Sequence, residues 1–217
     1  MRKLGWIGGL GPGATVHYYR ELVRRKAGEA VMIHADMAYG LKLVQAGDRQ
    51  GLADYFARII ERLAGAGAEV AAISAVTPHF CIRELEKITP LPLVNIIAEV
   101  SREIGRRGYR RVALFGTRYT VESRMFGLLE GVEVMTPAAP QVDAIHEAYM
   151  SIVNEREEGA ASTLSRIAAE LPVDAVVLAG TDLSLVFHEG NIEFPHVDAT
   201  VVHLDAILRE INSAREV

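Results

Sequence analysis

Three short polar turns carry side chains that could bind a small ligand or move a proton. Thr77 and His79 lie in the first turn, Thr117 lies in the second, and Thr181 and Asp182 lie in the third, each soon after an apolar run. Hydroxyl groups at the carboxyl ends of parallel strands are where open α/β sheets bind small molecules. Because threonine and aspartate also cap helices, the turns indicate a ligand site only as a set.

An arginine provides a further candidate, in the segment Gly47-Asp-Arg-Gln50 before a predicted helix. The guanidinium of Arg49 can hold a carboxylate through two parallel N–H···O bonds. The alternative is that Asp48 and Arg49 form a solvated capping pair, which is the commoner fate of such a dipeptide. Taken alone, the segment favours the capping pair over an anchor for a substrate carboxylate.

A glycine-rich turn spans residues 8–15, between a predicted strand and a predicted helix. Backbone amides in such a turn favour a local anion site at the start of the helix. Gly9, Gly11 and Ala14 also satisfy the dinucleotide-binding fingerprint, and Asp36 follows near the position of a ribose-binding acid. Pro12 removes one amide donor from the turn, so the other interpretation is a tight strand-to-helix corner.

The elements that must position these turns alternate along the chain. Short apolar runs predict strands at residues 3–8, 31–36, 70–75, 93–95, 112–115, 132–135, 175–179 and 196–197. Amphipathic stretches predict helices at residues 15–25, 52–64, 98–107, 121–129, 145–153 and 164–171. This alternation indicates parallel α/β layers.

The chain also repeats itself, since residues 70–79 and 91–98 follow the same order of features as residues 176–183 and 194–201. We interpret the repeat as two pseudo-symmetric α/β halves, each with a mainly parallel four-stranded sheet flanked by helices, with a ligand cleft between them. The halves are placed at residues 1–97 and 98–217, and the C-terminal helix can pack back onto the first half. The alternative is that any α/β protein repeats strand, loop and helix.

Composition excludes several classes of function. The formal charge of −5 and the pI near 5.8 give no global basic field for nucleic acid or anionic lipid. One cysteine, Cys81, excludes an intramolecular disulfide framework and a cysteine-rich zinc module. The apolar runs are far below the ~20 residues that span a bilayer. We therefore expect a cytoplasmic protein that binds neither nucleic acid, membrane nor metal.

The order and spacing of these segments resemble the aspartate/glutamate racemase superfamily, especially its aspartate racemase branch, over nearly the whole chain. Residues 8–15 resemble the branch's Gly-Gly-Met-Gly-Pro-x-Ala-Thr opening, and Asp48-Arg49 resembles its Pro-Asp-Arg loop. Further matches are Thr77 and His79 in the first turn, Gly116, Thr117, Thr120 and Ser123 in the second, Thr181 in the third, and Asp198, Thr200 and His203 near the end. The resemblance implies a homodimer that uses no cofactor and acts on a small carboxylate or amino acid.

The sequence departs from the family where the family places two catalytic cysteines, because Ala75 and Gly180 stand at those positions. Neither residue can carry a proton, so the resemblance predicts negligible racemisation of aspartate and glutamate. Cysteine at both positions is a further test: regained exchange would show that a substrate Cα lies between them, and no exchange would leave a binding protein and a different lyase or isomerase equally open. As replacement catalytic groups we expect Asp182 and His79. Cys81 is a weaker alternative, since one thiol cannot serve two faces of a substrate.

The sequence therefore favours a cofactor-independent enzyme resembling these racemases, an isomerase or a related lyase or decarboxylase with non-standard catalytic residues. The residues expected to bind the substrate are Leu10, Arg49, Thr77, Thr117 and Thr181. One alternative is a catalytically silent paralogue that binds a small carboxylate. Another is a dinucleotide-dependent oxidoreductase, as the glycine-rich turn suggests.

Overall fold

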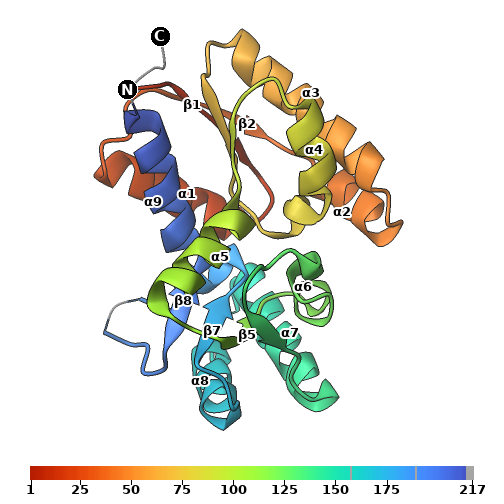
Figure 1. Ribbon diagram of the computed structural model, residues 1–217, viewed down its shortest axis with the longest axis vertical. Helices are drawn as coiled ribbons and strands as arrows, with labels where there is room; N and C mark the ends of the chain where they lie inside the picture. Colours follow the sequence, from red (N-terminus) through yellow and green to blue (C-terminus); the bar gives the residue numbers. More distant parts are fainter. Residues whose placement is uncertain (157, 189, 214–217) are drawn as a thin grey trace. The chain divides into compact units, whose positions relative to one another are not determined.

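The protein folds into two compact units, each built on a parallel sheet (Figure 1). The structure is a computed structural model that describes residues 1–156, 158–188 and 190–213. The first unit comprises Met1–Asn95 together with the chain from His203 onward, and the second comprises Ile96–Val202. No helix among the described residues has the length and hydropathy that crossing a membrane requires.

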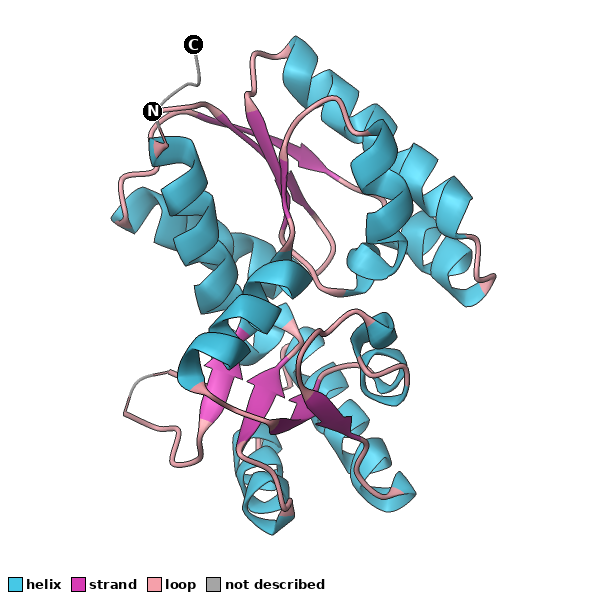
Figure 2. Ribbon diagram, in the orientation of Figure 1, coloured by secondary structure: helices cyan, strands magenta, loops and turns pink. Residues whose placement is uncertain are grey.

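The sheet of the first unit has four parallel strands in the order β2-β1-β3-β4. These strands are β1 (Leu4–Gly8), β2 (Ala30–His34), β3 (Val70–Ile73) and β4 (Leu93–Val94). The helices of the unit are α1 (Pro12–Arg24), α2 (Met37–Gln45), α3 (Arg49–Gly65) and α4 (Ile82–Ile88), with the 3₁₀ turn η1 (Thr77–Cys81). Most of α9 (Ala199–Asn212) also belongs to it. Figure 2 shows α1 and α9 on one face of this sheet and α2, α3 and α4 on the other.

Alternating side chains of β1 explain why helices cover both faces of the first sheet. Leu4 and Trp6 point to one face, where they join a buried cluster that includes residues of α1 and α9. Gly5 points to the other face, and a Cβ atom there would lie 2.8 Å from the Cβ of Ala68 and 3.1 Å from the Cβ of Leu63. Glycine at this position therefore lets the end of α3 approach the sheet closely.

The sheet of the second unit repeats this arrangement in the order β6-β5-β7-β8, again with all strands parallel. Its strands are β5 (Arg111–Phe115), β6 (Glu133–Met135), β7 (Ala175–Leu178) and β8 (His196–Asp198). Its helices are α5 (Ile96–Arg107), α6 (Arg118–Glu122), α7 (Ala139–Val153) and α8 (Ala160–Glu170), with the 3₁₀ turns η2 (Met125–Gly127) and η3 (Thr181–Leu185). Helix α7 packs against α8 and β5, and α5 packs against β8.

The two sheets confirm the predicted pair of pseudo-symmetric α/β halves with parallel four-stranded sheets. In each sheet the order of the strands reverses direction at the centre. The reversal lies between β1 and β3 in the first sheet and between β5 and β7 in the second. Loops at the carboxyl ends of such neighbouring strands diverge, and open α/β sheets bind ligands there. The turns that were identified from sequence follow these four strands.

One predicted helix, at residues 121–129, is interrupted. Helix α6 ends at Glu122, and Arg124, Met125 and Phe126 then adopt positive φ angles of 52°, 56° and 65°. A left-handed conformation costs a residue with a side chain roughly 1–2 kcal/mol, so this turn stores strain that a helical pattern does not reveal. Helices α2 and α4 were not predicted, because 9- and 7-residue helices show little periodicity.

Candidate functional site

The glycine-rich turn after β1 satisfies much of its own hydrogen-bonding capacity. The Gly9 amide donates to the Thr15 hydroxyl at 2.9 Å, and that hydroxyl donates to the Gly11 carbonyl at 2.7 Å. Pro12 begins α1 and contributes no N–H. The carboxylate of Asp36 caps α2 by accepting from the Tyr39 amide at 3.0 Å. The turn is therefore built as a strand-to-helix corner, which does not favour the dinucleotide alternative.

Arg49 is the first residue of α3, and its side chain is directed to the η1 turn. Asp48 caps the helix by accepting from the Gly51 amide at 2.8 Å, as the capping alternative expected for this residue. The Arg49 guanidinium donates from Nη1 to the Phe80 carbonyl, and its Cζ lies 3.9 Å from the centroid of the Phe80 ring. Since a guanidinium has five donors, this contact fixes the side chain while other donors can still bind a carboxylate.

The η1 turn itself holds Thr77, which is half-buried, and His79, which is fully buried. His79 donates from Nδ1 to the Ala75 carbonyl at 3.0 Å, which leaves Nε2 as the acceptor nitrogen of a neutral ring. Nε2 is buried and has no hydrogen-bond partner among the described residues. Burial, and then the nearby His203, lowers the pKa of His79 to about 3. His79 is therefore a neutral imidazole with an unused lone pair.

A second buried histidine, His203, has both ring nitrogens engaged within the same unit. The Tyr18 hydroxyl donates to Nδ1 at 2.9 Å, and Nε2 donates to the Val94 carbonyl at 3.0 Å. Its ring meets that of His79 edge-on, with the centroids 6.4 Å apart. Burial lowers the pKa of His203 to about 4. These contacts give His203 a structural role in holding α9 against α1 and β4.

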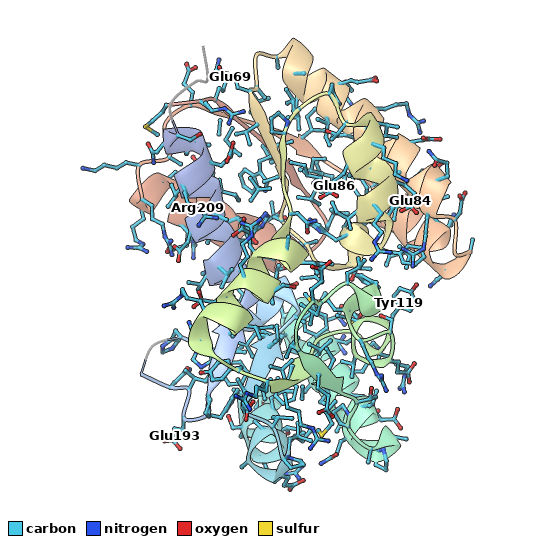
Figure 3. All side chains as sticks on the ribbon, viewed as in Figure 1. Glu69, Glu84, Glu86, Tyr119, Glu193 and Arg209 are labelled. Carbon is cyan, nitrogen blue, oxygen red and sulfur yellow. The ribbon has the colours of Figure 1, made fainter. Side chains whose placement is uncertain are left out.

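Cys81 is a buried structural residue. Its Sγ donates to the Pro78 carbonyl at 3.3 Å. Burial, and then the charge of Glu84, raises the pKa of the thiol to about 12. Glu84 is labelled in Figure 3 on α4, the helix that follows the η1 turn. A thiol with this pKa stays protonated at neutral pH, so it does not supply the thiolate that a base would need.

In the second unit, Thr117 caps α6. Its hydroxyl accepts from the Thr120 amide at 3.1 Å and lies 2.9 Å from the Thr120 hydroxyl. Gly116, just before it, approaches the end of β7 so closely that a Cβ atom would lie 3.3 Å from the Ala179 carbonyl carbon and 3.4 Å from the Gly180 nitrogen. The turns after β5 and β7 are therefore brought side by side at the carboxyl ends of neighbouring strands.

The turn after β7 contains Gly180, Thr181 and Asp182, and the last two are buried. The hydroxyl of Thr200 donates to the Thr181 carbonyl at 3.2 Å. Asp182 is not the cap of η3, because Gly180 occupies that position without a side-chain bond. Its Oδ2 instead accepts a hydrogen bond from the Tyr149 hydroxyl at 3.2 Å.

Tyr149 was not identified from sequence. It belongs to the buried stripe of α7, with Val142, Ile145, Ala148 and Ile152, and a tyrosine in such a stripe is indistinguishable by pattern from a core residue. Its pKa is raised well above the ordinary value, mainly by burial and also by the charge of Asp182. The phenol is therefore neutral and serves as a hydrogen-bond donor.

Asp198 supports the same turn from β8. Both of its carboxylate oxygens accept from the Ser184 hydroxyl at 2.9 Å, and Oδ1 also accepts from the Thr200 amide at 2.8 Å. Burial raises its pKa, although the hydrogen bonds from Ser184, Val201 and Thr200 oppose that shift. Asp198 thus ties η3 to the first turn of α9, which is a structural role.

Comparison with known proteins identifies the family. The model of the family described as Asp/Glu/Hydantoin racemase matches residues 7–207. An Asp/Glu racemase candidate from Yersinia pestis is 25% identical, with a TM-score of 0.82 over 98% of this chain and 100% of that one. An aspartate racemase homologue from Pyrococcus horikoshii is 22% identical, with a TM-score of 0.81 over 98% of this chain and 100% of its own. A glutamate racemase from Bacillus anthracis is 16% identical, with a TM-score of 0.66 over 97% of this chain and 83% of its own. The chain belongs to the Asp/Glu/hydantoin racemase family.

Proposed function

We propose that this protein is a cofactor-independent, racemase-like enzyme that moves the α-proton of a small amino acid or carboxylate. The observation that carries the proposal is the family match over residues 7–207. Chemistry at such a carbon requires an anchor for the carboxylate, a base, and stabilisation of the charge that develops on the substrate. The two parallel sheets supply turns of suitable chemistry at their carboxyl edges.

Arg49 is assigned as the carboxylate anchor. Its contacts with the carbonyl and ring of Phe80 hold the guanidinium in one orientation, which lowers the entropy lost when a substrate binds. Thr77 lies in the same turn as Phe80, and its hydroxyl can contribute a further hydrogen bond. Leu10, Thr117 and Thr181 complete the set that we propose to contact the substrate.

Asp182 and His79 are assigned as the groups that exchange protons. Asp182 is a buried carboxyl group at the carboxyl edge of the second sheet, where a low local dielectric strengthens its electrostatic interactions. His79 presents a lone pair on Nε2 that no described residue uses, and its lowered pKa of about 3 makes this nitrogen a weak base in the free enzyme. Neither group depends on a metal ion or an organic cofactor to accept a proton.

The test is exchange of the substrate α-proton with solvent deuterium, followed by proton NMR in D₂O. The probes are the L and D forms of aspartate, glutamate, alanine and serine, each incubated separately with wild type, Arg49→Ala and Arg62→Ala. Arg62 is a matched control because it is an exposed arginine in the last turn of the same helix, α3.

We expect wild type and Arg62→Ala to exchange the same probe and Arg49→Ala to bind it more weakly. A hydrogen bond to a charged group contributes about 1.5–3 kcal/mol, which corresponds to a rise in KM of roughly 10- to 150-fold. If wild type exchanges none of the probes, the proposed function is rejected. If Arg49→Ala and Arg62→Ala behave alike, Arg49 is not the anchor.

A further inference from the structure

Gly180 and Tyr149 form a matched pair at the carboxyl end of β7. A Cβ atom at position 180 would lie 2.2 Å from Cε2, 2.7 Å from Cζ and 2.9 Å from Cδ2 of the Tyr149 ring. The backbone at Gly180 is extended, with φ −116° and ψ 123°, which a residue with a side chain also adopts comfortably. The backbone does not require glycine here, and the position of the aromatic ring explains why glycine is present.

The ring that fills this space brings a phenol to a buried carboxylate. Tyr149 Oη donates to Asp182 Oδ2 at 3.2 Å, and only 8% of the Tyr149 surface and 2% of the Asp182 surface are exposed. The Cζ atom that carries the hydroxyl group is one of the ring atoms nearest to position 180. The phenol oxygen therefore lies beside the turn that joins β7 to η3, at the edge where the second sheet changes strand order.

We infer that Tyr149 and Asp182 act as a proton relay, with Tyr149 in contact with the reacting carbon of the substrate; this inference rests on the proposed function. In the forward step the Cα–H bond of the substrate breaks, and its electron pair remains on the substrate as the enolate of the carboxylate. The proton forms a new O–H bond with the phenol oxygen. The original phenol proton passes to Oδ2 of Asp182. The reverse transfers return a proton to the carbon.

The relay explains how a phenol can act here without becoming a phenolate. Burial and the charge of Asp182 raise the pKa of Tyr149, so a free phenolate is not available at neutral pH. In the relay the phenol oxygen gains one proton as it loses another, and the charge change occurs on Asp182. A catalytic group oriented by a buried carboxylate is a recurring arrangement in enzymes.

The test compares Tyr149→Phe and Asp182→Asn with Tyr109→Phe, a control that removes a phenol hydroxyl elsewhere in the second unit. Both relay variants keep the shape of the original side chain, so they test chemistry with little change in packing. The α-proton exchange of the amino-acid probes gives kcat and KM, and circular dichroism confirms that each variant is folded. The double variant Tyr149→Phe with Asp182→Asn shows whether the two residues act as a unit.

We expect each single relay variant to lose about 10²- to 10⁴-fold in kcat, with KM unchanged. The double variant should lose no more than the more impaired single variant. If Tyr149→Phe exchanges as fast as Tyr109→Phe while wild type is active, the relay is overturned and the proposed function stands. If wild type exchanges none of the probes, the proposed function and the relay are both overturned.

Discussion

Replacement of Gly180 by alanine tests the observation on which the relay depends. The new Cβ atom would lie 2.2 Å from Cε2 of Tyr149, far inside a normal contact distance. Tyr149 is buried in the stripe of α7, so its ring cannot move aside without displacing neighbours. Overpacking of this kind typically costs about 1–3 kcal/mol. In a chain of this length the cost corresponds to a fall in Tm of roughly 2–12 °C.

A double-mutant cycle separates this collision from any other effect of alanine at position 180. Tyr149→Ala alone should cost about 3–5 kcal/mol, because it leaves a cavity in the core. With the ring removed, Gly180→Ala should cost little, so the two changes should differ from additivity by about 1–3 kcal/mol. Urea unfolding followed by far-UV circular dichroism and by Trp6 fluorescence gives the free energies where the two transitions coincide.

Additivity of the two changes would refute the reasoning, as would a Gly180→Ala variant as stable as wild type. Either result would mean that the ring does not occupy the space next to Gly180 in solution. The expected result also bears on the proposed test with cysteines at positions 75 and 180. Tyr149 fills the place of a side chain at 180, so Gly180→Cys should destabilise the second unit instead of restoring a thiol mechanism.

Two further predictions follow from buried titratable groups. Burial raises the pKa of Cys81 to about 12, so the thiol should resist alkylation by iodoacetamide. The Cys81→Ala variant should keep the full rate of α-proton exchange. A large loss of exchange in this variant would restore the thiol alternative. Stability should fall as the pH is lowered from 6.5 to about 4, since unfolded His203 binds a proton in this range and folded His203, with a pKa of about 4, does not. The difference between the folded and unfolded pKa of His203 corresponds to about 3 kcal/mol of stability. The free energy of urea unfolding should therefore depend less on pH in His203→Gln than in the exposed control His188→Gln. An equal dependence on pH in the two variants would contradict this prediction.

The strands were predictable from sequence because their apolar runs are both short and continuous. All four residues of β3 and of β7 are buried, as expected for central strands of parallel sheets covered on both faces. The repeated order of strand and turn also predicted the duplicated topology. Helix boundaries depended more on tertiary structure: α6 ends early because the chain turns through left-handed residues, starting at Arg124, that no periodic pattern specifies.

The candidate site was predictable only in part, because residue type does not reveal what a side chain touches. Asp48 and Arg49 were identified together from sequence. Only the structure shows that Asp48 caps the helix and that the Arg49 side chain is directed to η1. The sequence pointed to Asp182 but could not show which residue it contacts. Its partner, Tyr149, comes from a helix more than thirty residues earlier in the chain and follows the spacing of a core residue.

The presence of Tyr149 changes the argument about catalysis at position 180. From sequence, glycine there indicates the loss of a proton-carrying group, and negligible racemisation of aspartate and glutamate follows. In the structure the same glycine makes room for a phenol that is hydrogen-bonded to a buried acid. The prediction for aspartate and glutamate now depends on whether Tyr149 and Asp182 transfer protons as a unit, which the exchange rates of Tyr149→Phe and Asp182→Asn decide.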